Sequence, residues 1–217
     1  MPSGCTPAEF GRKAAGWLEA KILELGPETV AAFIGEPIQG AGGVIIPPET
    51  YWPEVERICR KYGVLLVADE VICGFWRTGH YWGSQTLDIE PDILTCAKAL
   101  SSSYLPISAV MVNQRVFDAL AKESNEIGTF GHGFTYGGHP VACAVALKTL
   151  DIYKSDRIVD HVRAVAPALQ NGLRALASHP LVGEARGIGL IGALELVKDK
   201  AGKDPFPPAA GIGGKAA

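Results

Sequence analysis

Residues 91–100 read Pro91-Asp92-Ile93-Leu94-Thr95-Cys96-Ala97-Lys98-Ala99-Leu100. A lysine therefore follows directly after a short apolar run of the kind that forms buried strands. A second such run lies upstream and ends in two acids, Val64-Leu65-Leu66-Val67-Ala68-Asp69-Glu70. Strands that are apolar along their whole length and alternate with helices are typical of an α/β fold. We therefore expect a mostly parallel sheet with flanking helices, with a lysine and an aspartate at the ends of two strands.

Local signals divide the rest of the chain into helices and strands. Thr6, Pro7 and Glu9 form a capping-box pattern that predicts a first helix, which ends at Gly26-Pro27. A second helix is predicted over 50–62, with Gly63 as its C-cap. We expect buried strands at 30–34, 64–68 and 93–96, a further strand at 108–112, and helices at 114–122, 138–154 and 156–178. The glycine-rich, aromatic segment 72–90 is expected to be an irregular functional loop.

The pattern changes beyond residue 155. Segments 181–186 and 190–197, joined around Gly187-Ile188-Gly189, are typical of an antiparallel pair. We therefore predict two units: a partial large domain over 1–155, and the start of a small α+β C-terminal domain over 156–217.

Composition excludes several classes of protein. The 217 residues are 47% hydrophobic and 20% charged, which is enough to bury a core. A net charge of −3 gives no reason to expect nucleic acid or an anionic membrane as a partner. No apolar run approaches a membrane span, and the segment 1–5 does not resemble a secretory signal. Five cysteines without a CxxC pair indicate free thiols in a reducing cytoplasm. The histidine spacing predicts no metal site.

The lysine and aspartate at the strand ends suggest one particular cofactor. Pyridoxal 5'-phosphate (PLP) needs a lysine for a Schiff base and an acid for its pyridinium nitrogen. Asp69 ends a buried strand, where open α/β sheets bind ligands. Alone, such an acid is more often a loop cap, and a single lysine is usually solvated. Their joint placement with Thr95, ahead of Ser101-Ser102-Ser103, favours the cofactor.

Four segments in this order closely resemble the class III aminotransferases, a family of PLP-dependent transferases that includes the ω-amino acid transaminases. They are Gly35-Glu36-Pro37-Ile38-Gln39-Gly40-Ala41-Gly42-Gly43, Asp69-Glu70-Val71-Ile72-Cys73-Gly74-Phe75-Trp76-Arg77-Thr78-Gly79, Ala97-Lys98-Ala99-Leu100 and His132-Gly133-Phe134-Thr135-Tyr136-Gly137-Gly138-His139-Pro140. The resemblance extends from about residue 8 to the end of the chain. It implies the fold type I of PLP transferases and a homodimer.

The resemblance also implies roles for particular residues. Lys98 would form the Schiff base with PLP and then move a proton between substrate and cofactor. Asp69 would bind the ring nitrogen, and Val71 would pack on the ring face. Phe134 and Thr135 would reach the cofactor phosphate of the other subunit, so that the active site is shared across the dimer.

The implied reaction transfers an amino group from a primary amine or ω-amino acid to a keto acid such as pyruvate. Glu36 resembles the glutamate that pairs with a mobile arginine in relatives, and Ala41 would line the substrate pocket. Ile72 stands where the ornithine and GABA branches carry glutamine, which favours the amine:pyruvate branch. Trp76 and Ala99 both stand where the family commonly has glycine.

Family members are about twice as long as this chain. The resemblance therefore implies a fragment that lacks the N-terminal half and the C-terminal end. Two alternatives stay open at this point. The same fold also supports aminomutases and epimerases, whose motifs are shared. The chain could instead be a catalytically incompetent fragment that needs a partner chain to cover an exposed sheet edge.

Overall fold

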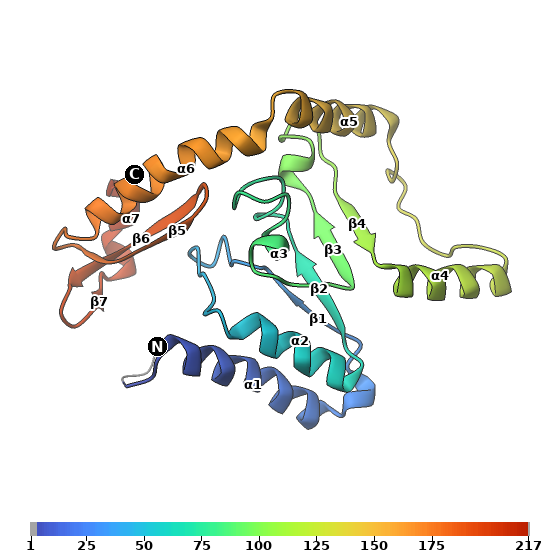
Figure 1. The fold of residues 1–217 in the computed structure, drawn as a ribbon, viewed down its shortest axis with the longest axis horizontal. Helices are drawn as coiled ribbons and strands as arrows, with labels where there is room; N and C mark the ends of the chain where they lie inside the picture. Colours follow the sequence, from blue (N-terminus) through green and yellow to red (C-terminus); the bar gives the residue numbers. More distant parts are fainter. Residues whose placement is uncertain (1–3, 217) are drawn as a thin grey trace.

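The computed structural model describes residues 4–216 and contains two separate β-sheets with helices beside them (Figure 1). Residues 1–3, which belong to the segment compared above with secretory signals, and residue 217 lie outside the described part. The elements of the first 112 residues are α1 (Pro7–Leu25), η1 (Pro27–Thr29), β1 (Ala32–Gly35), α2 (Tyr51–Tyr62), β2 (Leu65–Asp69), α3 (Gly83–Thr86), β3 (Ile93–Cys96), η2 (Lys98–Leu100) and β4 (Ala109–Val112). The remaining elements are α4 (Gln114–Ile127), α5 (Pro140–Ser155), α6 (Ile158–Leu176), β5 (Val182–Ile188), β6 (Ile191–Asp199), β7 (Asp204–Pro205), η3 (Pro208–Ala210) and α7 (Ile212–Ala216).

The larger sheet has four strands in the order β1-β2-β3-β4. β1, β2 and β3 are parallel, and β4 is antiparallel to β3. The prediction of an α/β fold with a mostly parallel sheet is therefore confirmed. In this register Gly35 pairs with Ala68, and Asp69 pairs with Thr95, so the carboxyl ends of the three parallel strands meet at one edge.

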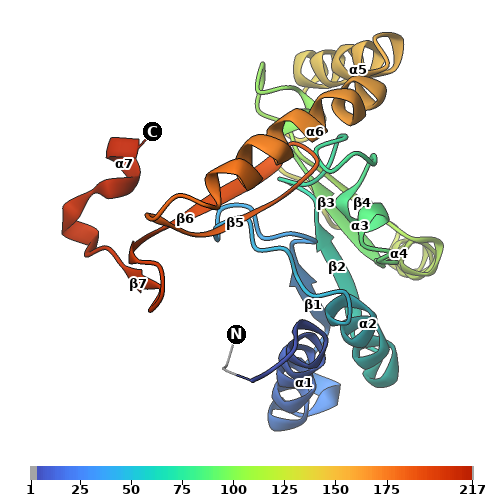
Figure 2. The ribbon, with the colours of Figure 1, turned by 60° about the vertical axis from the view of Figure 1, so that its left-hand side comes forward.

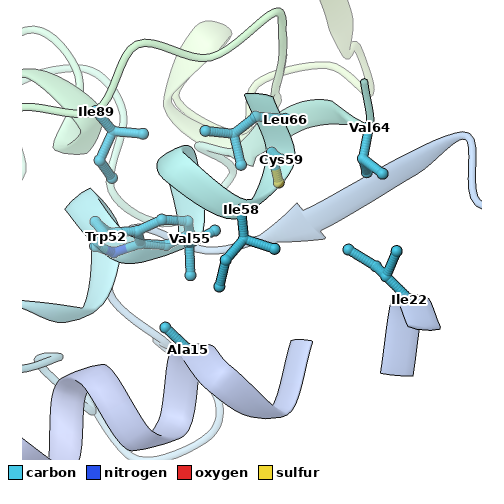
Figure 3. Packing of buried hydrophobic residues seen from close by; sticks show 9 residues of the cluster. All are labelled: Ala15, Ile22, Trp52, Val55, Ile58, Cys59, Val64, Leu66 and Ile89. Carbon is cyan, nitrogen blue, oxygen red and sulfur yellow. The ribbon is translucent and has the colours of Figure 1, made fainter. Parts of the chain in front are cut away.

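Helices α1 and α2 lie side by side and cover one face of this sheet (Figure 1). The predicted capping box is present: Thr6 Oγ1 accepts a hydrogen bond from the backbone N–H of Glu9, whose carboxylate accepts one from the N–H of Thr6. Gly63 ends α2 in the left-handed conformation, as predicted. Figure 3 shows the buried apolar cluster that these helices form with β2; its members are Ala15, Ile22, Trp52, Val55, Ile58, Cys59, Val64, Leu66 and Ile89.

Three predicted segments differ from the structure, and the first is the loop expected at 72–90, in which Gly83–Thr86 form the short helix α3. The strand expected to be buried at 30–34 runs from Ala32 to Gly35, and Ile34 is 59% exposed. The prediction of burial was wrong because only one face of β1 is covered within residues 4–216: Phe33 packs on the core with Trp52 of α2, whereas Ile34 points to the opposite face. Helix α4 continues to Ile127, five residues beyond the predicted end.

The second sheet is formed by the C-terminal part of the chain, with the order β5-β6-β7. β5 and β6 are antiparallel, which confirms the predicted pair. Figure 2 shows α6 running along this sheet, where Gln170 Nε2 donates hydrogen bonds to the carbonyl oxygens of Gly189 (2.9 Å) and Ile191 (3.1 Å). The predicted domain boundary at residue 155 falls at the end of α5, and the division into two domains remains a prediction.

Asp92 ties three strands together at the amino end of the larger sheet. Its Oδ2 accepts a hydrogen bond from the backbone N–H of Leu66 (3.0 Å), and its Oδ1 accepts from Asn113 Nδ2 and Arg115 (both 2.8 Å). Burial alone would raise the pKa of this carboxyl, but the hydrogen bonds outweigh burial and lower the pKa below its ordinary value of 3.8. The carboxylate form is therefore the one that the fold stabilises.

We expect Asp92→Ala to lower the free energy of unfolding by about 2 kcal/mol, because a charged acceptor of three hydrogen bonds is lost. Urea denaturation at pH 7 measures this loss. Because the folded pKa is depressed, the contribution of Asp92 is present above pH 3.8 and disappears as the pH falls through the lowered pKa. The matched control is Glu24→Ala, which breaks an exposed ion pair with Lys21 and should change stability by less than about 0.5 kcal/mol. Equal losses in the two variants would contradict the role of Asp92.

Candidate active site

Three of the residues singled out in the sequence lie along one edge of the larger sheet. Asp69 is the last residue of β2, and Lys98 follows β3 by two residues. Glu36 follows directly after Gly35, the last residue of β1. Because Gly35 pairs with Ala68 and Asp69 pairs with Thr95, these positions are adjacent at the carboxyl ends of the strands. This edge is where open α/β sheets bind ligands.

Asp69 has an unused carboxylate oxygen next to an unused hydroxyl. Asp69 Oδ1 accepts a hydrogen bond from the backbone N–H of Val71 (3.0 Å), whereas Oδ2 has no hydrogen-bond partner among residues 4–216. Thr95 projects from the same face of the sheet as Asp69, since the two residues are register partners. Its Oγ1 atom is buried and has no hydrogen-bond partner in the described part of the chain. A buried polar atom without a partner is uncommon, so a polar group placed against this hydroxyl would satisfy it.

Lys98 lies in a strained turn. Its φ angle is +40°, and two following residues also have left-handed angles, Ser102 (+49°) and Ser103 (+64°). Non-glycine residues hold such angles only where the surrounding structure enforces them. Within the turn, the backbone N–H groups of Ser101 (3.2 Å) and Ser103 (3.3 Å) both donate to the carbonyl oxygen of Lys98.

Glu70, next to Asp69, is a residue whose role the sequence analysis missed. It is 1% exposed, and its carboxylate accepts hydrogen bonds from the backbone N–H groups of Gly83 (2.8 Å) and Ser84 (2.6 Å). Burial raises the pKa of Glu70, and the hydrogen bonds from residues 83 and 84 oppose this rise. Glu70 thus closes the loop 71–82, which carries Val71. The sequence signal for this role was the pair of consecutive acids, Asp69 and Glu70, at the end of a buried strand. Because successive side chains point to opposite faces, only one of the two can face the site.

The loop after β1 carries Glu36 and Ala41. Glu36 Oε2 accepts a hydrogen bond from the backbone N–H of Gly40 (2.8 Å), which folds the loop back on itself. Arg186, on β5, holds the far side of this loop: its Nε donates to the carbonyl oxygens of Gly43 (2.8 Å) and Val44 (3.2 Å). A residue of the C-terminal sheet therefore fixes a loop at the edge of the larger sheet. No local sequence signal predicts this contact, which joins positions more than 140 residues apart.

The loop 71–82 is held by aromatic side chains. Phe75, Trp76, Tyr81 and Trp82 contact one another, with the Trp76 and Tyr81 rings 4.4 Å apart. Trp76 has a φ angle of +73°, a conformation that glycine adopts without strain. This agrees with the family's usual glycine at position 76.

Phe134 and Thr135 do not join the other residues singled out. Both lie in the exposed segment between α4 and α5, and Phe134 is 79% exposed. Within this chain they are not part of the edge formed by Asp69 and Lys98. Their expected role concerns the site of a second subunit, and it remains a prediction.

The residues at the strand ends fit PLP. A free oxygen of Asp69 suits the protonated ring nitrogen, the buried hydroxyl of Thr95 lies on the same face, and Lys98 supplies the amine at the end of the neighbouring strand. Among residues 4–216 no cluster of three or more potential metal ligands was found. Within the same range, no helix is long and apolar enough to cross a membrane.

Comparisons with known proteins identify the family of this chain. The family model of class III aminotransferases matches residues 11–213. The chain is 52% identical to γ-aminobutyrate transaminase 3 of Solanum lycopersicum over 210 residues, covering 97% of this chain and 40% of that protein. It is also 52% identical to vanillin aminotransferase of Capsicum chinense, covering 94% of this chain and 44% of that protein.

Solved structures give the same result. The ω-transaminase of Pseudomonas jessenii, determined in complex with PMP, superposes with a TM-score of 0.91 at 53% identity, covering 94% of this chain and 45% of that one. A transaminase determined with L-alanine superposes with a TM-score of 0.94 at 52% identity, covering 99% of this chain and 51% of that one. The chain thus spans about half the length of its relatives or less and shares the fold of PLP-type transaminases. By sequence and by structure, it belongs to the class III aminotransferases.

Proposed function

We propose that this chain carries the lysine-bearing part of a PLP-dependent transaminase, which moves an amino group from a primary amine or ω-amino acid to a keto acid such as pyruvate. The observation that carries this proposal is the placement of Asp69 and Lys98 at the carboxyl ends of adjacent strands, beside the unpartnered hydroxyl of Thr95. The names of the relatives, which are transaminases, support the same reaction class.

PLP, when bound, takes up the amino group and acts as an electron sink for the reacting carbon. Lys98 would hold the cofactor through Nζ, and its amine would carry a proton to and from the reacting carbon. Asp69 keeps a proton on the ring nitrogen with its free carboxylate oxygen. Val71 orients the ring by packing on its face.

Other residues of the chain bind the substrate and the partner's cofactor. Glu36 and Ala41 lie in one loop at this edge, where Glu36 receives a cationic group and Ala41 leaves space for the substrate. In a homodimer, Phe134 and Thr135 of one subunit bind the phosphate in the other subunit's site. Ile72 favours the branch that passes the amino group of an amine to pyruvate. A relative named as a γ-aminobutyrate transaminase is as similar in sequence, at 52% identity, as a solved transaminase.

We also propose a cytoplasmic location and a division of the chain into two domains. The cysteines are free thiols in the structure, which suits a reducing cytoplasm. Several relatives are named as mitochondrial or chloroplastic proteins. The large PLP-binding unit comprises residues 1–155, and the small unit begins at residue 156.

Trapping of the cofactor tests the proposal. The chain is mixed with PLP and reduced with borohydride, and the modified lysines are identified by peptide mass spectrometry. We expect modification to concentrate on Lys98 and to be lost in Lys98→Ala. The matched control is Lys148→Ala, which removes an exposed lysine of α5 and should leave the Lys98 adduct unchanged. Modification spread evenly over exposed lysines, and equal in both variants, would contradict the assignment of Lys98.

A further inference from the structure

Tyr153, on helix α5, contacts the strained turn that follows Lys98. Its hydroxyl donates a hydrogen bond to the carbonyl oxygen of Ala99 (2.7 Å) and lies 2.6 Å from Ser102 Oγ. A carbonyl oxygen can only accept, so the single proton of Tyr153 points to Ala99 and the Ser102 hydroxyl donates to Tyr153. One hydroxyl therefore connects the residue after Lys98 with a residue at the far side of the turn.

This contact is placed where the backbone needs support. Lys98, Ser102 and Ser103 all have positive φ angles, and each such residue is unfavourable unless its surroundings enforce it. The backbone N–H groups of Ser101 and Ser103 donate long hydrogen bonds of 3.2–3.3 Å to the Lys98 carbonyl oxygen. Further backbone hydrogen bonds run from Leu100 to Ala97 (2.9 Å), from Ser102 to Ala99 (3.3 Å) and from Tyr104 to Ser101 (3.0 Å). A second brace is Ser101 Oγ, which donates to the carbonyl oxygen of Leu105 (2.6 Å). The hydrogen bond from Tyr153 differs from these because it comes from helix α5 and not from the turn itself.

The ring of Tyr153 is itself well anchored. It packs against the buried cluster of Phe75, Leu94, Cys96, Leu100 and Ala146. The Tyr153 and Phe75 ring centroids are 6.3 Å apart. The hydroxyl thus extends from a fixed ring rather than from a mobile surface side chain, which is what a positioning residue requires.

From this geometry we propose that Tyr153 is a positioning residue for Lys98. It holds the turn 98–103, with its three left-handed residues, from helix α5 and thereby fixes where the lysine amine lies relative to Asp69. The proposal rests on the proposed function for its catalytic meaning. The bracing of the turn itself can be measured without cofactor.

The first experiment is hydrogen exchange of the 217-residue chain, read on peptides that cover residues 97–105. Tyr153→Phe keeps the ring and removes only the hydroxyl, so the hydrogen bonds with Ala99 and Ser102 are both lost and exchange in this segment should become about tenfold faster or more. Exchange in strand β2 should not change. The matched control is Tyr62→Phe, which removes a hydroxyl bound to Glu19 and should leave 97–105 unaffected. Unchanged exchange in 97–105 for Tyr153→Phe would overturn the proposal.

Ser102→Ala provides a second variant. It should have a smaller effect than Tyr153→Phe, because Tyr153 still donates to Ala99. In the double variant, Ser102→Ala should add little to Tyr153→Phe, since both act through one hydroxyl. Fully additive effects would contradict a shared brace.

The second experiment is the borohydride trapping of PLP. In Tyr153→Phe we expect the yield at Lys98 to fall severalfold while scattered modification elsewhere stays constant. Faster exchange with an unchanged Lys98 yield would overturn the positioning role. If the unmodified sequence itself gives no preference for Lys98, the proposed function fails for this chain, and the exchange data still decide whether Tyr153 braces the turn.

Discussion

Glu70→Ala is expected to lower the free energy of unfolding by about 3 kcal/mol, because the buried N–H groups of Gly83 and Ser84 both lose their acceptor. Glu70 is 1% exposed, so water cannot replace the missing carboxylate in the native packing. The loop 71–82 should open, since Glu70 closes it from one side. Urea denaturation measures the loss of stability. The fluorescence of Trp76 and Trp82, which both lie in this loop, reports the opening of the loop.

Glu70→Gln is the matched variant, because it keeps the size and one acceptor oxygen but no charge. We expect it to lose less than Glu70→Ala. The folded pKa of Glu70 is raised above its ordinary value of 4.5 by burial, so its contribution to stability is fully present below pH 4.5 and declines as the pH rises through the raised pKa. The difference in stability between the natural sequence and Glu70→Gln should therefore be largest below pH 4.5. A difference that grows with pH would contradict this assignment.

Gly189→Ala should lower the free energy of unfolding by roughly 3 kcal/mol, about as much as Glu70→Ala, but through a steric clash. Gly189 lies in the tight turn between β5 and β6, with a φ angle of +57°. A Cβ atom there would lie 2.5 Å from the carbonyl oxygen of Arg77 and 2.7 Å from the Cα atom of Thr78. Both neighbours are backbone atoms, which cannot move aside cheaply. The left-handed backbone adds its own cost of about 1–2 kcal/mol.

A glycine-to-alanine substitution at a position without close neighbours provides the control. Gly172 lies in helix α6, and a Cβ atom there would meet no atom within 4 Å. Gly172→Ala should raise stability by about 0.5–1 kcal/mol, because alanine is the better helix former. Thermal and urea unfolding of the two variants should thus give shifts of opposite sign. A stabilised Gly189→Ala would show that the hairpin turn does not pack on the loop 71–82.

Local signals predicted the elements of this fold well where the signal lay within a few residues. The Thr6–Glu9 capping box and the left-handed Gly63 define helix ends through short-range hydrogen bonds, so the sequence alone was sufficient. The burial of β1 was predicted wrongly because it depends on what covers each face of an edge strand. Ile34 looks like a core residue in the sequence, yet it is mostly exposed.

The candidate site was predictable only in part, for the same reason. Asp69 and Lys98 could be assigned to the same edge because parallel strands end together. Contacts from distant segments also reach this edge: Tyr153 reaches Ala99, next to Lys98, across 54 positions, and Arg186 reaches Gly43, in the loop that carries Glu36, across 143. Tyr153 and Arg186, which make these contacts, do not lie in any recognisable sequence motif. Only the packing of α5 and of the C-terminal sheet against the larger sheet brings them together.

The loop 71–82 is held from both sides. Glu70 holds it at the end of β2, while Leu190 donates a hydrogen bond to the carbonyl oxygen of Arg77 (2.9 Å) and Arg163 donates one to that of Gly79 (2.9 Å). Thermodynamic linkage makes such coupling reciprocal. A small molecule bound beside Asp69 would make the β5–β6 hairpin harder to melt, and melting of the hairpin would weaken the binding of that molecule by the same free energy.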